Sequence, residues 1–151
     1  MRTKSVSVVV TTLLAVTFAA SAYAARWQGW RGSGGWGMNG AYQRLYDPAK
    51  VETLSGEVVR VETMPARKGP GSGIHLQLKT DQGTIPVHLG PSWFVERLDE
   101  RIAKGDRVEV KGSRITFDGK PAIIAAEVKK GKEVLTLRDA NGVPVWAGWR
   151  R

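Results

Sequence analysis

The chain has 151 residues, with 23 Lys and Arg against 14 Asp and Glu, a net charge of +9, and no cysteine. The lack of cysteine excludes disulfides, a lipoprotein acyl site, thiolate metal sites and covalent haem attachment. The positive charge favours a polyanion or an acidic protein as partner, although basic charge also serves solubility alone.

Residues 1–24 have the pattern of a secretory signal peptide. Arg2 and Lys4 precede an apolar run over 6–20, which is shorter than the roughly 18 residues that a membrane span needs. A small-x-small motif follows at 22–24, so we expect cleavage after Ala24 and a periplasmic location. An uncleaved anchor helix is the alternative. Cleavage would leave 21 basic and 14 acidic residues, a charge of about +7, on one modest domain.

Residues 25–48 are predicted to form a flexible arm, because glycine is dense and no apolar period is present. Tryptophan and arginine alternate in it, and the same pair of residue types returns at the C-terminal end of the chain. These tryptophans could bind a partner, stack on bases or sugars, insert at a membrane interface, or fold back over the domain's own apolar surface. The candidate partner-binding residues are Trp27, Trp30, Trp36, Trp146 and Trp149.

The stretch 73–90 predicts a β-hairpin, since its halves alternate apolar and polar residues around a turn at 81–83. Pairing Leu76 with Val87 and Leu78 with Ile85 places the apolar side chains on one face. The same register sets His75 opposite His88 on the other face, and these are the two histidines of the chain.

The other elements follow in order. A long strand is expected over 51–64, with a bulge near Val58 or a bend at Gly56. A helix is expected to begin at 90–92 and to end at Gly105, because Phe94, Leu98 and Ile102 form one apolar stripe. Two strands over 105–117 and 120–128 are joined by the Asp118-Gly119 turn, and a short hairpin over 134–137 and 143–146 ends the chain.

This order resembles the OB-fold, an all-β five-stranded Greek-key barrel with one helix between its third and fourth strands. The residues behind the resemblance are Leu-Ser-Gly-Glu-Val-Val at 54–59, Lys-Gly-Asp-Arg-Val-Glu-Val-Lys-Gly at 104–112 and Ala-Ala-Glu-Val at 125–128. With the signal peptide, the chain looks like the small exported OB-fold proteins of the bacterial periplasm (BOF-like). We expect the barrel over 49–130 and a hairpin with a Trp/Arg tail over 131–151. The resemblance implies a binding module.

OB-folds bind ligands on the outer face of strands two and three and on the loops beside it. We therefore expect a basic ligand face, which would suit a polyanion or an acidic envelope partner. Oligonucleotide or DNA binding is an alternative, although the aromatic residues for base stacking lie in the arm and tail. The candidate ligand-binding residues are Arg67, Lys68, His75, Gln77, Lys79, His88, Arg114, Phe117 and Lys120.

A second alternative is a periplasmic metal-binding or metal-responsive protein that holds copper or zinc between His75 and His88. Opposed residues have Cβ atoms about 4.5–5.5 Å apart, so both imidazoles could reach one ion. A firm site needs three or four ligands, for which Met38 and Met64 are the available soft donors. The interpretation that we favour is a solvated histidine pair.

No pattern predicts catalysis. The sequence contains no recognisable Ser/His/acid set, no phosphate loop and no isolated carboxylate pair in an apolar setting. We therefore expect a non-enzymatic exported module without a resident cofactor.

Overall fold

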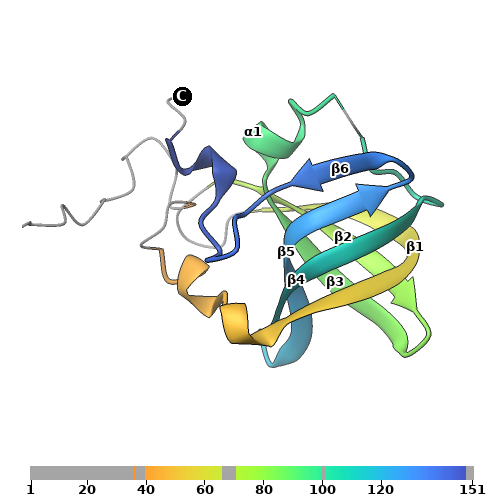
Figure 1. Cartoon of the computed structure of the whole chain (residues 1–151), viewed down its shortest axis with the longest axis horizontal. Coiled ribbons are helices and arrows are strands. Elements are labelled where there is room, and N and C mark those ends of the chain that lie inside the picture. Colours follow the sequence, from red (N-terminus) through yellow and green to blue (C-terminus); the bar gives the residue numbers. More distant parts are fainter. Residues whose placement is uncertain (1–35, 37–39, 66–70, 100, 149–151) are drawn as a thin grey trace, which may run out of the picture.

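The computed structural model describes residues 36, 40–65, 71–99 and 101–148. The predictions for residues 1–24, for Trp27 and Trp30, and for Trp149 concern residues outside these ranges. The described residues form an all-β protein with six strands and one short α-helix (Figure 1). The elements are β1 (Val51–Met64), β2 (Gly73–Thr80), β3 (Gly83–Pro91), α1 (Ser92–Val95), β4 (Arg107–Phe117), β5 (Lys120–Lys130) and β6 (Glu133–Thr136).

The first five strands form a closed sheet. The strand order is β3-β2-β1-β4-β5-β6, and β3 also pairs with β5, in parallel, through Val87 and Ile123. Each strand from β1 to β5 therefore has two neighbours within the closed sheet. The sixth strand, β6, adds to β5 outside the closed sheet. The predicted C-terminal hairpin is present only in reduced form. One antiparallel bridge joins Arg138 to Pro144, and the backbone N–H of Val145 donates to the Leu137 carbonyl at 3.0 Å, but residues 145–148 form a 3₁₀ turn instead of continuing a strand.

The predicted hairpin of β2 and β3 is confirmed with its register. Leu76 pairs with Val87, Leu78 with Ile85, and His75 with His88. The four apolar side chains are buried in the core. A slip by one residue would turn them all to the other face, so the apolar alternation fixes the position of the histidines.

Two glycines allow strands to change partners. The register of β1 shifts between Val58 and Arg60, after which β1 pairs with β2 alone. A Cβ at Gly56 would overlap the backbone carbonyl of Lys79 on β2. In β4 the register shifts at Gly112, where a Cβ would overlap the carbonyl of Ile124. Of the two options predicted for the first strand, the bulge near Val58 is confirmed, and Gly56 lies just before it where a side chain would have no room.

The helix predicted to extend to Gly105 is only one turn, α1. Leu98 and Ile102 still pack against the core, but from an irregular segment. The Asp106 carboxylate accepts a hydrogen bond from the backbone N–H of Ala103, at 2.8 Å. Contacts with the rest of the domain hold this segment. The prediction from the apolar stripe was therefore correct about which side chains are buried and wrong about the length of the helix.

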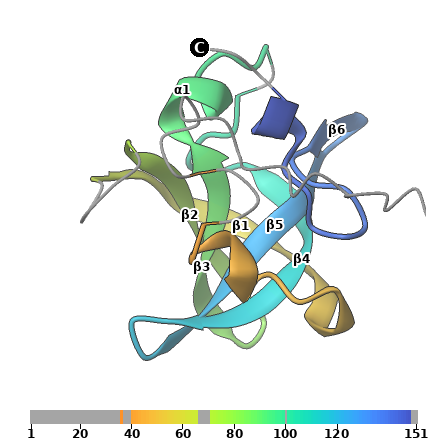
Figure 2. The same cartoon turned by 90° about the vertical axis from the view of Figure 1, so that its left-hand side faces the viewer.

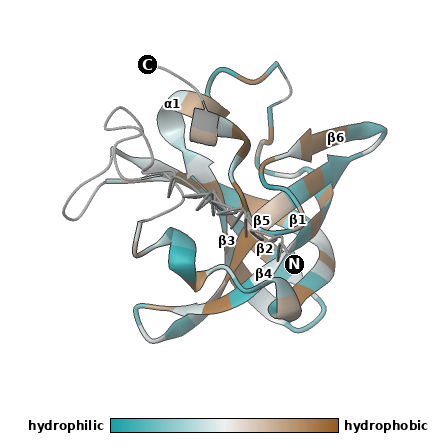
Figure 3. Ribbon diagram, turned by 60° about the vertical axis from the view of Figure 1, so that its left-hand side comes forward, coloured by the Kyte–Doolittle hydropathy of each residue, from teal (hydrophilic) through white to brown (hydrophobic). Residues whose placement is uncertain are grey.

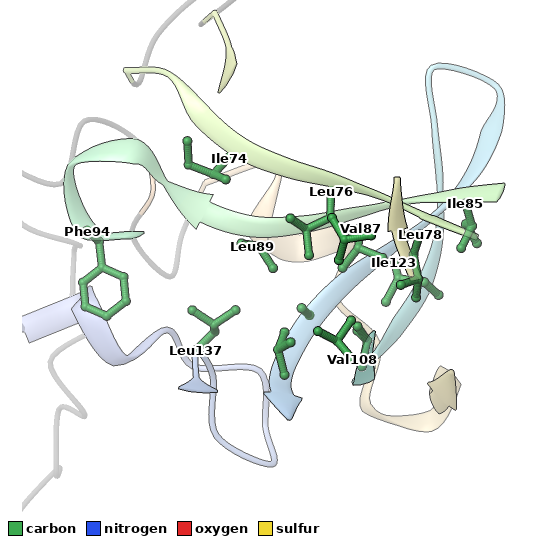
Figure 4. Close-up of a cluster of buried hydrophobic side chains, with 14 of the residues drawn as sticks. Ile74, Leu76, Leu78, Ile85, Val87, Leu89, Phe94, Val108, Ile123 and Leu137 are labelled. Carbon is green, nitrogen blue, oxygen red and sulfur yellow. The ribbon is translucent and has the colours of Figure 1, made fainter. Parts of the chain in front are cut away.

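The closed sheet has an inner and an outer apolar cluster, and β5 contributes to both. Ile123, Ala125 and Val128 join the inner cluster, part of which Figure 4 shows with residues of β2, β3 and α1. Ala122, Ile124 and Ala126 join an outer cluster with Tyr46 and Ile115. Because β5 is buried on both faces, its sequence is a continuous apolar run, and the chain before β1 covers the outer face.

Candidate functional site

The site is built on the stacked imidazoles of His75 and His88. Their ring centres are 3.7 Å apart and their planes differ by 8°. The two residues are only 9% and 2% exposed. The solvated histidine pair that we favoured from the sequence is therefore wrong. The register predicted that these residues meet, but it gave no sign that they are covered.

The chain before β1 covers the histidines, as the orange segment in front of β3 in Figure 2 shows. The Tyr42 hydroxyl lies 2.7 Å from Nδ1 of His88, and the Tyr42 ring is stacked at 5.8 Å. Phe117, at the end of β4, contacts the His88 ring edge-on at 4.9 Å, and Trp36 contacts Tyr42 edge-on at 5.3 Å. We call Trp36, Tyr42, His75, His88 and Phe117 the histidine cluster.

The covering segment is held by side chains rather than by strand pairing. The Gln43 amide donates to the carbonyl of Gly142, and the Tyr46 ring lies against the same glycine. The backbone N–H of Asp47 donates to the Ser113 hydroxyl at 2.9 Å, and that hydroxyl donates back to the Asp47 carbonyl at 3.0 Å. Residues 40–50 thus fold back over the domain. This is one of the options considered for the predicted arm, in which it covers the domain's own surface.

Burial keeps both imidazoles neutral. It lowers the pKa of His75 to about 4, against a smaller opposing effect of the Glu62 carboxylate. It lowers the pKa of His88 to about 3, and the charges of His75 and Arg138 lower it further. Burial also raises the pKa of the Tyr42 phenol. At neutral pH a protonated phenol therefore meets an uncharged imidazole.

Sequence reasoning missed Arg138, a buried cation that is 2% exposed. Its Nη1 donates to the carbonyl of Leu89, at 3.0 Å, and to that of Ala125. Its Nε and Nη2 have no hydrogen-bond partner among the described residues. Burial lowers the pKa of this guanidinium to about 10, so it stays charged. Arg138 follows a short edge strand, and no periodic pattern distinguishes it from an exposed arginine.

The other predicted ligand residues do not form one basic face. Gln77 donates to the Glu62 carboxylate at 3.1 Å, and Arg114 makes a two-fold ion pair with Glu52, the shorter contact being 2.6 Å. Lys79 and Lys120 are exposed. Arg67 and Lys68 lie outside the described residues.

The net charge is unevenly placed along the chain. The described residues include 15 Lys and Arg and 13 Asp and Glu, a net of +2, so +7 of the total +9 belongs to the rest of the chain. The folded domain is close to neutral.

The stacking disfavours a shared metal ion. An imidazole nitrogen offers its lone pair in the plane of the ring, so two parallel stacked rings cannot both aim at one ion without rotating. No cluster of three or more His, Cys, Asp or Glu suited to a metal occurs in the described ranges. Met64 is 40% exposed at the end of β1, and Met38 lies outside those ranges.

Two of the candidate partner-binding tryptophans join the ends of the domain. The Trp146 side chain is fully buried, and its indole N–H donates to the backbone carbonyl of Trp36 at 3.0 Å. The indole N–H of Trp36 donates to the carbonyl of Gly71 at 3.1 Å. Trp146 therefore has no exposed surface with which to bind a partner.

The described surface contains an apolar groove of about 140 Å³ between β1, β2 and the segment after α1. Its charged lining side chains are Glu96 and Arg101. Within the described ranges, no helix has the length and apolar character to cross a membrane.

Residues 50–135, more than half of the chain, match the model of the MamS/MamX magnetosome protein family. No curated protein sequence matches significantly. Among solved structures, the chain is similar to one in the complex of TiaS with tRNA and ATP, at 24% identity, a TM-score of 0.38, and coverage of 53% of this chain and 18% of that chain. It is also similar to the second OB-fold domain of replication protein A from Methanococcus maripaludis, at 25% identity, a TM-score of 0.39, and coverage of 55% and 85%. Both TM-scores are too low to support an argument.

Proposed function

Because the chain belongs to the MamS/MamX magnetosome protein family, we propose that it is an exported, non-enzymatic magnetosome protein that binds an acidic partner. Its Trp- and Arg-rich terminal segments would bind that partner, and the closed sheet would serve as the scaffold to which these segments are attached. The family that matches is MamS/MamX, and the match does not extend to the narrower BOF-like resemblance. Export is inferred from the signal-peptide pattern of residues 1–24.

We propose that the closed sheet is an OB-fold barrel. Five strands with a helix between the third and the fourth, and a parallel contact of β3 with β5 that closes the sheet, are the connectivity of that fold. OB-folds are mostly binding modules, which supports a non-enzymatic role.

The position of the positive charge favours the termini as the binding segments. The described domain is close to neutral, and the surplus belongs to other parts of the chain, including Arg26 and Arg31 before it and Arg150 and Arg151 after it. After signal cleavage, four of the basic residues outside the described ranges lie near the chain ends and two, Arg67 and Lys68, lie between β1 and β2. A partner attracted by the net charge would therefore meet mainly the terminal segments.

The observation that carries the proposal is the hydrogen bond from Trp146 to the carbonyl of Trp36, 110 residues away. Arg31 is five residues before Trp36, and Arg150 is four residues after Trp146. Trp36 and Trp146 thus bring the first and last parts of the described domain to one point, and an acidic partner at this point can meet both basic segments.

The test compares two variants with equal loss of charge. The first replaces Arg26, Arg31, Arg150 and Arg151 by Ser, and the control replaces the exposed Lys79, Lys111, Lys120 and Lys132 by Ser. Binding of residues 25–151 to poly-L-glutamate is measured by titration calorimetry at several salt concentrations. We expect the terminal variant to lose at least tenfold in affinity and most of the salt dependence, and the control to lose less than twofold. Equal losses, or an affinity that salt does not change, would overturn the proposal.

Oligonucleotide binding and metal binding are less well supported. Tyr42 and Trp36 lie over the face where an OB-fold would stack bases, and the parallel imidazoles do not converge on an ion. Titration with a single-stranded oligonucleotide, and with copper or zinc against His75→Ala, distinguishes these alternatives from the proposed function.

A further inference from the structure

We propose that the histidine cluster is an acid-sensitive latch, in which protonation of His75 and His88 releases Trp36 and residues 40–46 from β2 and β3 while the closed sheet stays folded. This inference concerns how the segment before β1 is held on β2 and β3. It does not depend on what the terminal segments bind.

The contact between Tyr42 and His88 depends on the charge of the imidazole. With its proton on Nε2, the neutral ring presents a lone pair at Nδ1, to which the Tyr42 hydroxyl donates across 2.7 Å. Protonation of Nδ1 places two donors face to face. The phenol must then turn away, or accept instead, inside a site that Phe117 and Trp36 fill.

The stack opposes a second positive charge. Two imidazolium rings with centres 3.7 Å apart would repel each other with little water between them. Glu62 on β1, directly opposite His75 and paired with Arg60 at 2.8 Å, favours charge on His75. Arg138, after β6, disfavours charge on His88. His75 therefore takes the first proton, and the second falls on the ring that Tyr42 covers.

The covering segment is the part of the structure that opens first. The strands are joined by continuous ladders, whereas residues 40–46 are held on the sheet by side-chain contacts. Gln43 is only 8% exposed, yet its Oε1 has no hydrogen-bond partner among the described residues. Local opening of this segment exposes both rings at lower cost than unfolding of the sheet does.

Opening restores ordinary histidines. Exposed imidazoles have a pKa of about 6.5, so between pH 6.5 and about 4 the open form binds up to two more protons than the closed form. The opening constant should then rise up to 100-fold for each unit that the pH falls.

The experiment is amide hydrogen exchange of the mature chain from pH 7 to pH 4, corrected for intrinsic rates. We expect the amides of Leu45 and Tyr46, which donate within the segment, to lose protection by at least tenfold per pH unit below pH 6. The amides of Val58 and Val110, in the core of β1 and β4, should stay protected. Loss of protection at all four sites together, or at none, would overturn the latch.

A variant without titratable rings provides the matched control. In His75→Phe with His88→Asn, a ring remains in the stack, and the Asn oxygen can take the place of Nδ1 as acceptor. We expect the protection of residues 42–46 to be independent of pH in this variant. If it does not fold, His75→Phe alone should halve the pH dependence. If the variant that is measured shows the same pH dependence of protection as the parent protein, the proposal is overturned.

Discussion

The guanidinium of Arg138 lies 4.9 Å from the centre of the Trp146 ring. The same group donates to the carbonyls of Leu89 and Ala125, where β3 and β5 separate beyond their short parallel contact. Trp146 in turn packs on Phe94 of α1, with ring centres 5.1 Å apart. The chain after β6 therefore closes the end of the sheet from which β3 leaves.

The first prediction concerns Arg138. Arg138→Met keeps the apolar stem and leaves two buried carbonyls without their donor, so we expect the free energy of unfolding to fall by about 2–4 kcal/mol. Urea denaturation measures it, and the exposed Arg107→Met is the control, with an expected change of under about 0.5 kcal/mol. A variant as stable as the parent would mean that burying the charge costs as much as its hydrogen bonds contribute.

The second prediction concerns Tyr42. Tyr42→Phe removes the hydroxyl that contacts His88 and keeps the ring, so we expect a loss of about 1 kcal/mol in the free energy of unfolding. A double-mutant cycle with His88→Phe isolates the pair, and its coupling energy should also be about 1 kcal/mol. Additive effects of the two substitutions would show that the hydroxyl and the imidazole do not stabilise each other.

The third prediction is a loss of stability in acid. Both histidines have a lower pKa in the folded protein than in the unfolded chain, so the unfolded chain binds more protons below pH 6.5. Their contribution is complete above pH 6.5 and is lost as the pH falls toward about 4 for His75 and about 3 for His88. The free energy of unfolding should fall by about 1.4 kcal/mol per pH unit for each histidine, down to the pH at which the N-terminal segment is released.

Urea denaturation at pH 7, 6 and 5 measures this dependence, with His75→Phe as the control that should show about half of it. A stability that does not change between pH 7 and pH 5 would contradict the buried, neutral state of the pair.

What the sequence could predict was set by local patterns. The alternation over 73–90 gave the strands and their register, because one face had to be apolar. The Asp118-Gly119 turn was equally readable, since both residues adopt the positive φ that this dipeptide tolerates, +50° and +75°. The sequence predicted β6 as a strand but not its pairing with β5. Figure 3 shows hydrophobic colour in β6, yet Val134 is 52% exposed, so the hydropathy of this strand did not indicate which strand it pairs with.

What the sequence could not predict depends on distant contacts. His75 and His88 were placed by register, but their cover comes from Tyr42, 46 residues before His88, in a stretch with no apolar period. The helix after Pro91 was overestimated because Asp106 and Lys130 hold the segment in another conformation. The sequence therefore predicted that the two imidazole rings meet, but it did not predict which residues cover them.

The last prediction concerns Gly112, where β4 changes register against β5. A Cβ there would overlap the carbonyl of Ile124 and the Cα of Ala125, both of them backbone atoms that cannot rotate away. Gly112→Ala must therefore push β4 and β5 apart, and we expect a loss of about 3 kcal/mol or more in the free energy of unfolding. Gly83→Ala is the control: its φ is +115°, but no atom lies within 4 Å of the added methyl, so backbone strain of about 1–3 kcal/mol is its main cost. Thermal and urea denaturation should rank Gly112→Ala below Gly83→Ala. The reverse order would mean that conformational strain at the turn matters more than the contact between the strands.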